Sequence, residues 1–190
     1  MPKNQFQRVV FALITVAITV HAYVFFSIYV VHGSMFMEIS GESHVLAAIN
    51  KIGGVPVLGN PIPIWGVVLI EFVFASLLEI LLGSPLSFRL ASKVFDPSTT
   101  HPVIFETAII CATVGIMCPV MSFIAAILYY NYQAGFNLFT LLAEWLKLVC
   151  FNFPFAYFTQ LFFIQPFVRT VFKAVFPGKA ENSAAENQRS

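Results

Sequence analysis

The sequence carries very little charge. Of its 190 residues, only 10% are Asp, Glu, Lys or Arg, whereas 58% are hydrophobic and 22 are phenylalanine. This excludes an ordinary soluble domain, in which about a quarter of the residues are charged. The formal net charge of +1 gives no overall field that would attract nucleic acid, so no nucleic-acid partner is expected. The composition indicates an integral membrane protein whose main surroundings are the lipid bilayer.

Cysteines and catalytic motifs are also scarce. Cys111, Cys118 and Cys150 lie inside apolar runs, where buried thiols are expected in place of disulfides or zinc ligands. The sequence contains no nucleophile elbow, HExxH, Walker loop, glycine-rich dinucleotide fingerprint or CxxC. We therefore expect no catalytic residue, no metal and no cofactor, and we predict that the protein is not an enzyme.

Four apolar runs reach the roughly 20 residues that a helix needs to cross a bilayer. They are Val9 to Val31, Ile62 to Leu82, Val103 to Tyr130, and Phe136 to about Phe167. The fourth run is longer than one crossing and contains Pro154 and Pro166, so we expect a kink and an interfacial continuation. A cleaved signal peptide is an alternative for the first run, but that run is longer than the usual signal core.

The basic residues are distributed unevenly between the loops. Only Lys51 and Lys147 lie on one side of the predicted helices, and eight lie on the other: Lys3, Arg8, Arg89, Lys93, Arg169, Lys173, Lys179 and Arg189. The positive-inside rule then predicts that both termini are cytoplasmic (N-in/C-in). We expect residues 177–190, which are small and polar, to form a disordered cytoplasmic tail.

The two halves of the chain match each other in two blocks. FQRVVFAL, from Phe6, aligns with FETAIICA, from Phe105, and a second offset aligns Trp65, Arg89, Lys93 and Pro97 with Trp145, Arg169, Lys173 and Pro177. Self-similarity of this kind predicts a parallel repeat of two tandem helical hairpins, residues 1–97 and 98–176. The fold class is thus an all-α integral membrane protein with four transmembrane helices, packed as a bundle.

The extra length of the first half falls in a long outer loop, at about residues 32–61. Its centre, His44 to Ile52, predicts a short amphipathic helix that ends at the turn signals of Gly53, Gly54 and Pro56.

Three segments resemble a known family: MPKNQFQRVVFALI at the start, MCPVMSFIAAIL in the third helix and NFPFAYFTQLFFIQPFVRTVFK in the fourth. They are similar to the bacterial membrane proteins of the domain of unknown function 2798, most closely over Val103 to Phe176. The resemblance implies a small protein of the bacterial cytoplasmic (inner) membrane, built from duplicated hairpins. It implies no particular activity.

Two carboxylates stand inside the second predicted helix. A charged side chain at mid-bilayer costs roughly 2.5 to 3.5 kcal/mol, so Glu71 and Glu79 are not expected to face lipid in the ionised form. Either they are protonated or they face the bundle interior and find partners there.

Depth along the helices suggests partners for both carboxylates. At about 1.5 Å per residue, His21 and Glu71 lie at similar depths, so they are candidates for an acid and imidazole pair. Glu79 lies near the depth of Glu106, where two carboxylates would share a proton or attract a cation. The alternatives are a polar contact between helices for the first pair, and cytoplasmic water or Arg89 for the second.

Two further polar groups lie in the fourth helix. Glu144 and Lys147 are spaced for a local ion pair near the outer interface. Asn152 lies deeper, beside Pro154, where a discontinuous helix could line a substrate cavity or simply hydrogen-bond to another helix.

Two functions follow from these polar residues. The first is a proton-linked transporter or exporter of a small lipophilic or cationic solute, with Glu71, His21, Glu79, Glu106 and Asn152 binding protons or solute. Because four helices enclose little volume, we expect a homodimer. The alternative is a non-transporting scaffold, sensor or regulatory subunit, in which the same residues only join helices.

Overall fold

The computed structural model describes residues 5–132 and 135–175, so the predicted tail at 177–190 lies outside the described residues. The helices and strands follow one another in this order: α1 (Gln5–Phe26), the π-helical segment η1 (Ser27–Val31), α2 (Gly33–Ser40), α3 (Val45–Ile52), β1 (Val55–Val57), β2 (Asn60–Ile62), α4 (Ile64–Leu78), the π-helical segment η2 (Glu79–Gly83), α5 (Ser84–Val94), α6 (Pro102–Leu128), α7 (Leu138–Thr159), the π-helical segment η4 (Gln160–Ile164) and α8 (Gln165–Val175).

The described chain is almost entirely helical and contains four helices long and apolar enough to cross a membrane: Val9–Val31, Ile64–Val94, Pro102–Leu128 and Leu138–Phe172. The four predicted crossings are confirmed as helices. The second and the fourth are longer than expected, because α4 runs through η2 into α5 and α7 runs through η4 into α8. The predicted end of the second helix at Leu82 is therefore wrong.

A proline explains why the second and the fourth long helices each contain a π-helical turn. Pro85 and Pro166 lie just after η2 and η4. A proline ring clashes with the carbonyl four residues earlier and donates no N–H, and a π-helical turn relieves that conflict without ending the helix. Pro154 does not end α7, which continues as an α-helix to Thr159. The kink expected at this residue stays a prediction.

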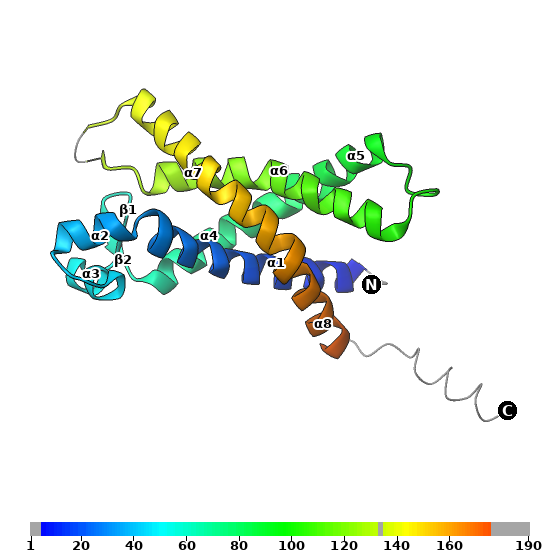
Figure 1. Ribbon diagram of the computed structural model, residues 1–190, viewed down its shortest axis with the longest axis horizontal. Coiled ribbons are helices and arrows are strands. Elements are labelled where there is room, and N and C mark those ends of the chain that lie inside the picture. Colours follow the sequence, from blue (N-terminus) through cyan, green and yellow to red (C-terminus); the bar gives the residue numbers. More distant parts are fainter. Residues whose placement is uncertain (1–4, 133–134, 176–190) are drawn as a thin grey trace.

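The four long helices surround a common axis (Figure 1). α1 contacts α4 on one side and η4 and α8 on the other, while α6 contacts both α7 and α5. The segment of residues 33–62 lies at one end of the bundle, which we call the cap end. The beginning of α1, the connection from α5 to α6, and α8 lie at the opposite end, which we call the base end (Figure 1).

Residues 33–62 form a folded cap and not an irregular loop. The helix predicted at 44–52 is confirmed as α3, and α2 precedes it. The strands β1 and β2 were not predicted; they pair antiparallel, with Val55 opposite Ile62, across a turn in which Leu58 and Gly59 both have positive φ. Positive φ at both central residues is typical of the type I′ turn, which joins the two strands of a hairpin with a two-residue loop.

The cap is attached to the bundle by an apolar core and by one backbone bond. Phe36, Ile49 and Val57 of the cap are buried in the same cluster as Ile28 and Val67 of the membrane helices. In addition, the Leu58 N–H donates to the carbonyl of Leu128, at the end of α6, over 2.7 Å. The cap therefore closes over the ends of α1, α4 and α6.

Gly54 provides a test of this cap. Its φ is +139°, and a Cβ there would lie 2.5 Å from the carbonyl oxygen of Ile62. We expect Gly54→Ala to lower the free energy of unfolding by about 2 to 3 kcal/mol, because backbone strain and a backbone clash add. Gly59→Ala is the matched control, since Gly59 also has positive φ but open space around it. Equal losses for the two variants in thermal unfolding would contradict the close approach of Gly54 to the Ile62 backbone.

Candidate functional site

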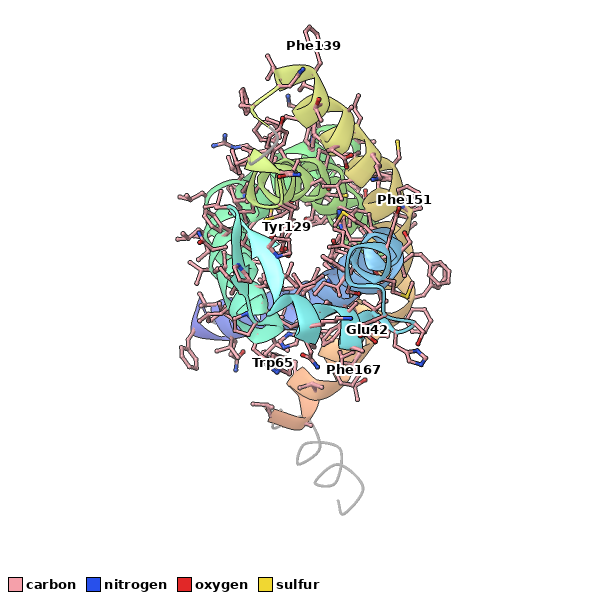
Figure 2. All side chains as sticks on the ribbon, turned by 90° about the vertical axis from the view of Figure 1, so that its left-hand side faces the viewer. Glu42, Trp65, Tyr129, Phe139, Phe151 and Phe167 are labelled. Atoms are coloured by element: carbon pink, nitrogen blue, oxygen red, sulfur yellow. The ribbon has the colours of Figure 1, made fainter. Side chains whose placement is uncertain are left out.

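A cavity of about 820 Å³ runs along the axis of the bundle. Its wall is formed by one face each of α1, α4, α6 and α7 with η4, together with residues of α5 and α8. Viewed from the cap end, Tyr129 lies on the inner side of the ring of helices, whereas Phe139 and Phe151 point away from it (Figure 2). Glu71, Glu79, Glu106 and Asn152, four of the five predicted site residues, line this cavity.

The cavity extends across most of the thickness that a membrane would occupy. Along α6, lining residues recur every three or four positions from Glu106 through Thr113 and Ser122 to Ala125. At 1.5 Å per residue this stripe is about 28 Å long, which is close to the roughly 30 Å of a hydrocarbon core. The polar residues of the wall lie at successive levels along this stripe.

Glu71 occupies the cap-end level. It is 8% exposed, and its Oε1 accepts a hydrogen bond from the Tyr129 hydroxyl over 2.5 Å. Among the described residues, no Lys, Arg or His forms an ion pair with it. The carboxyl group therefore faces the interior of the bundle, as the cost of facing lipid required, but its partner is a phenol and not an imidazole.

His32 lies beside this pair. Its ring centroid is 6.3 Å from that of Tyr129, and its Nδ1 lies 3.2 Å from the carbonyl oxygen of Ser27. Burial lowers the pKa of His32 below its usual value, because the charged imidazolium loses solvent there. At neutral pH the imidazole is therefore uncharged, and Ser27, His32, Tyr129 and Glu71 form a polar group under the cap.

The predicted pairing of His21 with Glu71 is wrong. His21 is exposed, its Nδ1 lies 2.7 Å from the carbonyl oxygen of Ala17, and its ring packs 5.9 Å from that of Trp65, which is 66% exposed. Equal depth in the membrane does not fix the direction in which a side chain points around the helix axis. Thr19 and Val20 line the cavity, and each residue turns the helix by about 100°, so His21 faces outward.

Asn152 occupies the middle level. It is 5% exposed; its Nδ2 donates to Ser122 Oγ over 3.2 Å, while its Oδ1 has no hydrogen-bond partner among the described residues. About two turns toward the base end, Gln160 Nε2 donates to Thr19 Oγ1 over 2.7 Å. These bonds join α7 and η4 to α6 and α1.

Glu79 and Glu106 occupy the base-end levels and have separate partners. Glu79 Oε1 accepts a hydrogen bond from Ser84 Oγ over 2.8 Å, and Glu106 Oε2 forms an ion pair with Arg169 over 2.7 Å. The two carboxylates line one cavity, as their predicted depths implied, but no shared hydrogen bond joins them. The expected basic neighbour, Arg89, is replaced by Arg169.

Gly83 shapes the position of the Glu79 carboxylate. This carboxylate lies against the Cα of Gly83, so that a Cβ there would overlap Glu79 Oε2. The glycine thus lets the side chain fold along the π-helical turn to reach Ser84.

On the outside of the bundle, Glu144 and Lys147 form the predicted ion pair, at 3.3 Å.

Three of these contacts could not be expected from helix depth alone. Tyr129 lies at the end of α6 and shows no pattern that marks a carboxyl partner, and Ser84 becomes a partner only because of the π-helical turn. Arg169 had a clearer signal, since it is a basic residue within a long amphipathic helix.

No group of three or more His, Cys, Asp or Glu in the described ranges is arranged to hold a metal ion.

Comparison with known proteins identifies the second half of the chain. Residues 102–176 match the model of a family described as a domain of unknown function (DUF2798). Residues 102–176 are thus a DUF2798 domain. The segment is the part of the sequence in which the resemblance is most evident, so that prediction is confirmed. Searches among curated proteins and among solved structures give no match.

The DUF2798 segment supplies much of the cavity wall. It includes α6, α7 and α8, and thus Tyr129, Ser122, Asn152, Glu106 and Arg169. Glu71 and Glu79 come from α4, in the first half of the chain. The family description assigns no activity, so the chemistry of the site has to be argued from these side chains.

Tyr129→Phe tests the cap-end group. Without the hydroxyl, the buried Glu71 carboxyl loses its donor, and we expect the free energy of unfolding to fall by about 1 to 3 kcal/mol. Tyr132→Phe is the control, because the Tyr132 hydroxyl donates to the Ile127 carbonyl at an exposed position. Thermal unfolding in detergent would measure both variants. A loss for Tyr129→Phe no larger than that for Tyr132→Phe would show that the contact with Glu71 does not stabilise the bundle.

Proposed function

We propose that the protein is a small transporter of the bacterial cytoplasmic membrane that exchanges protons for a small lipophilic or cationic solute. One observation carries this proposal. The cavity of about 820 Å³ lies in the size range of sites that hold drug-sized molecules, and acidic residues interrupt its largely apolar wall. An inert bundle has no need of such a space.

Glu71 is the proposed proton-binding group. A carboxyl group that is buried without a cationic partner is stable when it holds a proton or when a cation binds beside it, because low dielectric disfavours a lone charge. The two occupancies exclude each other. If the bundle alternates between states open to either side, this exclusion couples movement of a cation to movement of a proton in the opposite direction.

Glu79 and Glu106 are proposed to act at the entrance on the base end. The pair of Glu106 with Arg169 lies in the cavity wall at this end, and Glu79 lies between that pair and the middle of the bundle. A cation that enters from this end would meet a carboxylate before it reaches Asn152.

The base end is proposed to be cytoplasmic, so that the chain is N-in/C-in. Support comes from Arg89 and Lys93 on α5 and from Arg169 at the α8 end, since basic residues favour the cytoplasmic side. Figure 1 supports the arrangement further, because the beginning of α1 and the end of α8 lie at the same end of the bundle. The cap would then face the periplasm.

The tandem arrangement of residues 1–97 and 98–176 is likewise a proposal. Support comes from η2 and η4, which begin 81 residues apart, at Glu79 and Gln160. This spacing agrees within one residue with the offset of 80 between Trp65 and Trp145. In both halves the π-helical turn precedes a proline within the second long helix.

A homodimer stays a prediction, but its original reason is weaker. We expected one copy to enclose too little volume for a solute, whereas a single chain encloses about 820 Å³. The proposed transport therefore does not require a residue from a second copy. No catalytic reaction is proposed.

The second candidate function is a non-transporting scaffold, sensor or regulatory subunit. Its support is that each cavity carboxylate has a partner within the chain: Tyr129 for Glu71, Ser84 for Glu79 and Arg169 for Glu106. Hydrogen bonds of this kind also hold membrane helices together. Under this alternative, replacement of Glu71 would alter stability without any loss of solute movement.

Glu71→Gln separates the two candidates. Glutamine keeps an oxygen that can accept from Tyr129 but cannot bind or release a proton near neutral pH. We expect proton flux driven by octylguanidinium, a lipophilic cation with N–H groups, to fall at least tenfold when it is measured with pyranine inside proteoliposomes. Glu144→Gln is the matched control, because Glu144 lies outside the cavity, and its flux should equal that of the unmodified chain. Unchanged flux in Glu71→Gln would reject the proposed role of this carboxylate.

A further inference from the structure

The middle of the cavity contains a polar group that the bundle itself does not satisfy. Asn152 is 5% exposed and lies in the cavity wall, and its Oδ1 has no hydrogen-bond partner in the described part of the chain. Buried amide oxygens are nearly always paired, because an unpaired one loses its water without compensation. This oxygen is covered by the surrounding side chains and has no donor among the described residues, so a donor from outside the chain reaches it only when the amide turns toward the cavity.

The other half of the same amide is held in place. Nδ2 donates to Ser122 Oγ, and the Tyr23 hydroxyl donates to the backbone carbonyl of Asn152 over 3.5 Å. These contacts fix the residue between α1 and α6. The terminal torsion of asparagine is broad, so the amide can turn its oxygen toward the cavity without a change of the helix, and this turn gives up the bond from Nδ2 to Ser122.

Charge around this position favours a cation. Three carboxylates line the cavity, those of Glu71, Glu79 and Glu106, against the single guanidinium of Arg169. Arg169 pairs with Glu106, so that two carboxylates are left without a cation. A positively charged N–H donor bonds to the amide oxygen and is also attracted by the two carboxylates that lack a cation.

The register of α6 places Asn152 between these two carboxylates. Glu71 bonds to Tyr129, seven residues from Ser122 and thus about 10 Å toward the cap. Glu79 lies beside Gly83, which faces Met117, five residues from Ser122 and about 8 Å toward the base. A cationic group at Asn152 is therefore flanked by acid on both sides.

The remaining wall near this level is apolar and adaptable. Val20 and Val114 are buried there, and Met117 and Met121 add flexible thioether side chains. A wall of this kind accommodates an alkyl or aryl chain better than a hydrated ion.

We propose that Asn152 marks a binding site for the protonated head of an amphiphilic primary amine, whose N–H group donates to Oδ1 and whose apolar chain lies along the cavity. The inference rests on the proposed function, in that it names the class of solute. It differs in requiring N–H donors, so that a quaternary ammonium with the same chain and charge is a poor ligand.

Competition binding tests this site. Radiolabelled octylamine is the probe, bound to the purified full chain in nanodiscs, and octylamine, octyltrimethylammonium and octanol are the competitors. We expect saturable binding, with octylamine at least ten times more effective than octyltrimethylammonium and with octanol inactive. In Asn152→Leu, octylamine affinity should fall on the order of tenfold, since a hydrogen bond to a charged group is lost. The affinity for octyltrimethylammonium should not change.

Asn152→Asp is the second variant, because it keeps an oxygen acceptor of nearly the same size and should retain the preference for octylamine. If Asn152→Leu does not fold, the competitor series on the unmodified chain still decides. Equal competition by octylamine and octyltrimethylammonium, a lack of saturable binding, or an unchanged preference in folded Asn152→Leu would overturn the proposal. Selective binding without proton flux would reject transport and keep this site, whereas flux without selectivity would reject the site alone.

Discussion

The cost of placing polar groups in hydrocarbon governs this structure. Glu71, Glu79 and Asn152 lie in helices that are otherwise apolar enough to cross a membrane, and each is turned toward one internal cavity. A helix that must hide such groups on one side presents its phenylalanines and leucines on the other. The polar side of each helix therefore lines the cavity, and its apolar side forms the lipid-facing surface. Within the bundle, Tyr129 bonds to Glu71, Ser84 to Glu79 and Ser122 to Asn152.

The rest of the architecture supports this cavity. The π-helical turns before Pro85 and Pro166 allow α4 and α7 to continue as long helices that cover its length. The cap of residues 33–62 packs over one end through Phe36 and Ile49. At the other end Glu106 and Arg169 form an ion pair. One end is therefore packed with apolar side chains, and the other carries a charge pair.

Composition and hydrophobic length predicted the four long helices, and the cost of burial predicted that the helix carboxylates face inward. Rise per residue placed Glu79 and Glu106 on one cavity but paired His21 with Glu71 wrongly, because depth does not fix rotation about the helix axis. The hairpin of β1 and β2 was missed because three-residue strands joined through a Leu58–Gly59 turn leave little periodic pattern. Tyr129 could not be found as a partner, since its contact with Glu71 joins α6 to α4 across 58 residues of the chain.

The proposed transport requires that water reaches the interior of the bundle while the outer surface faces lipid. Cysteines placed at Thr113, in the cavity wall, and at Leu77, on the outer surface of α4, test it most directly in a chain whose native cysteines are replaced. A membrane-impermeant thiol reagent should modify Thr113→Cys in proteoliposomes and leave Leu77→Cys unmodified. Protection of Thr113→Cys, or equal modification at both positions, would contradict a water-accessible path through the bundle.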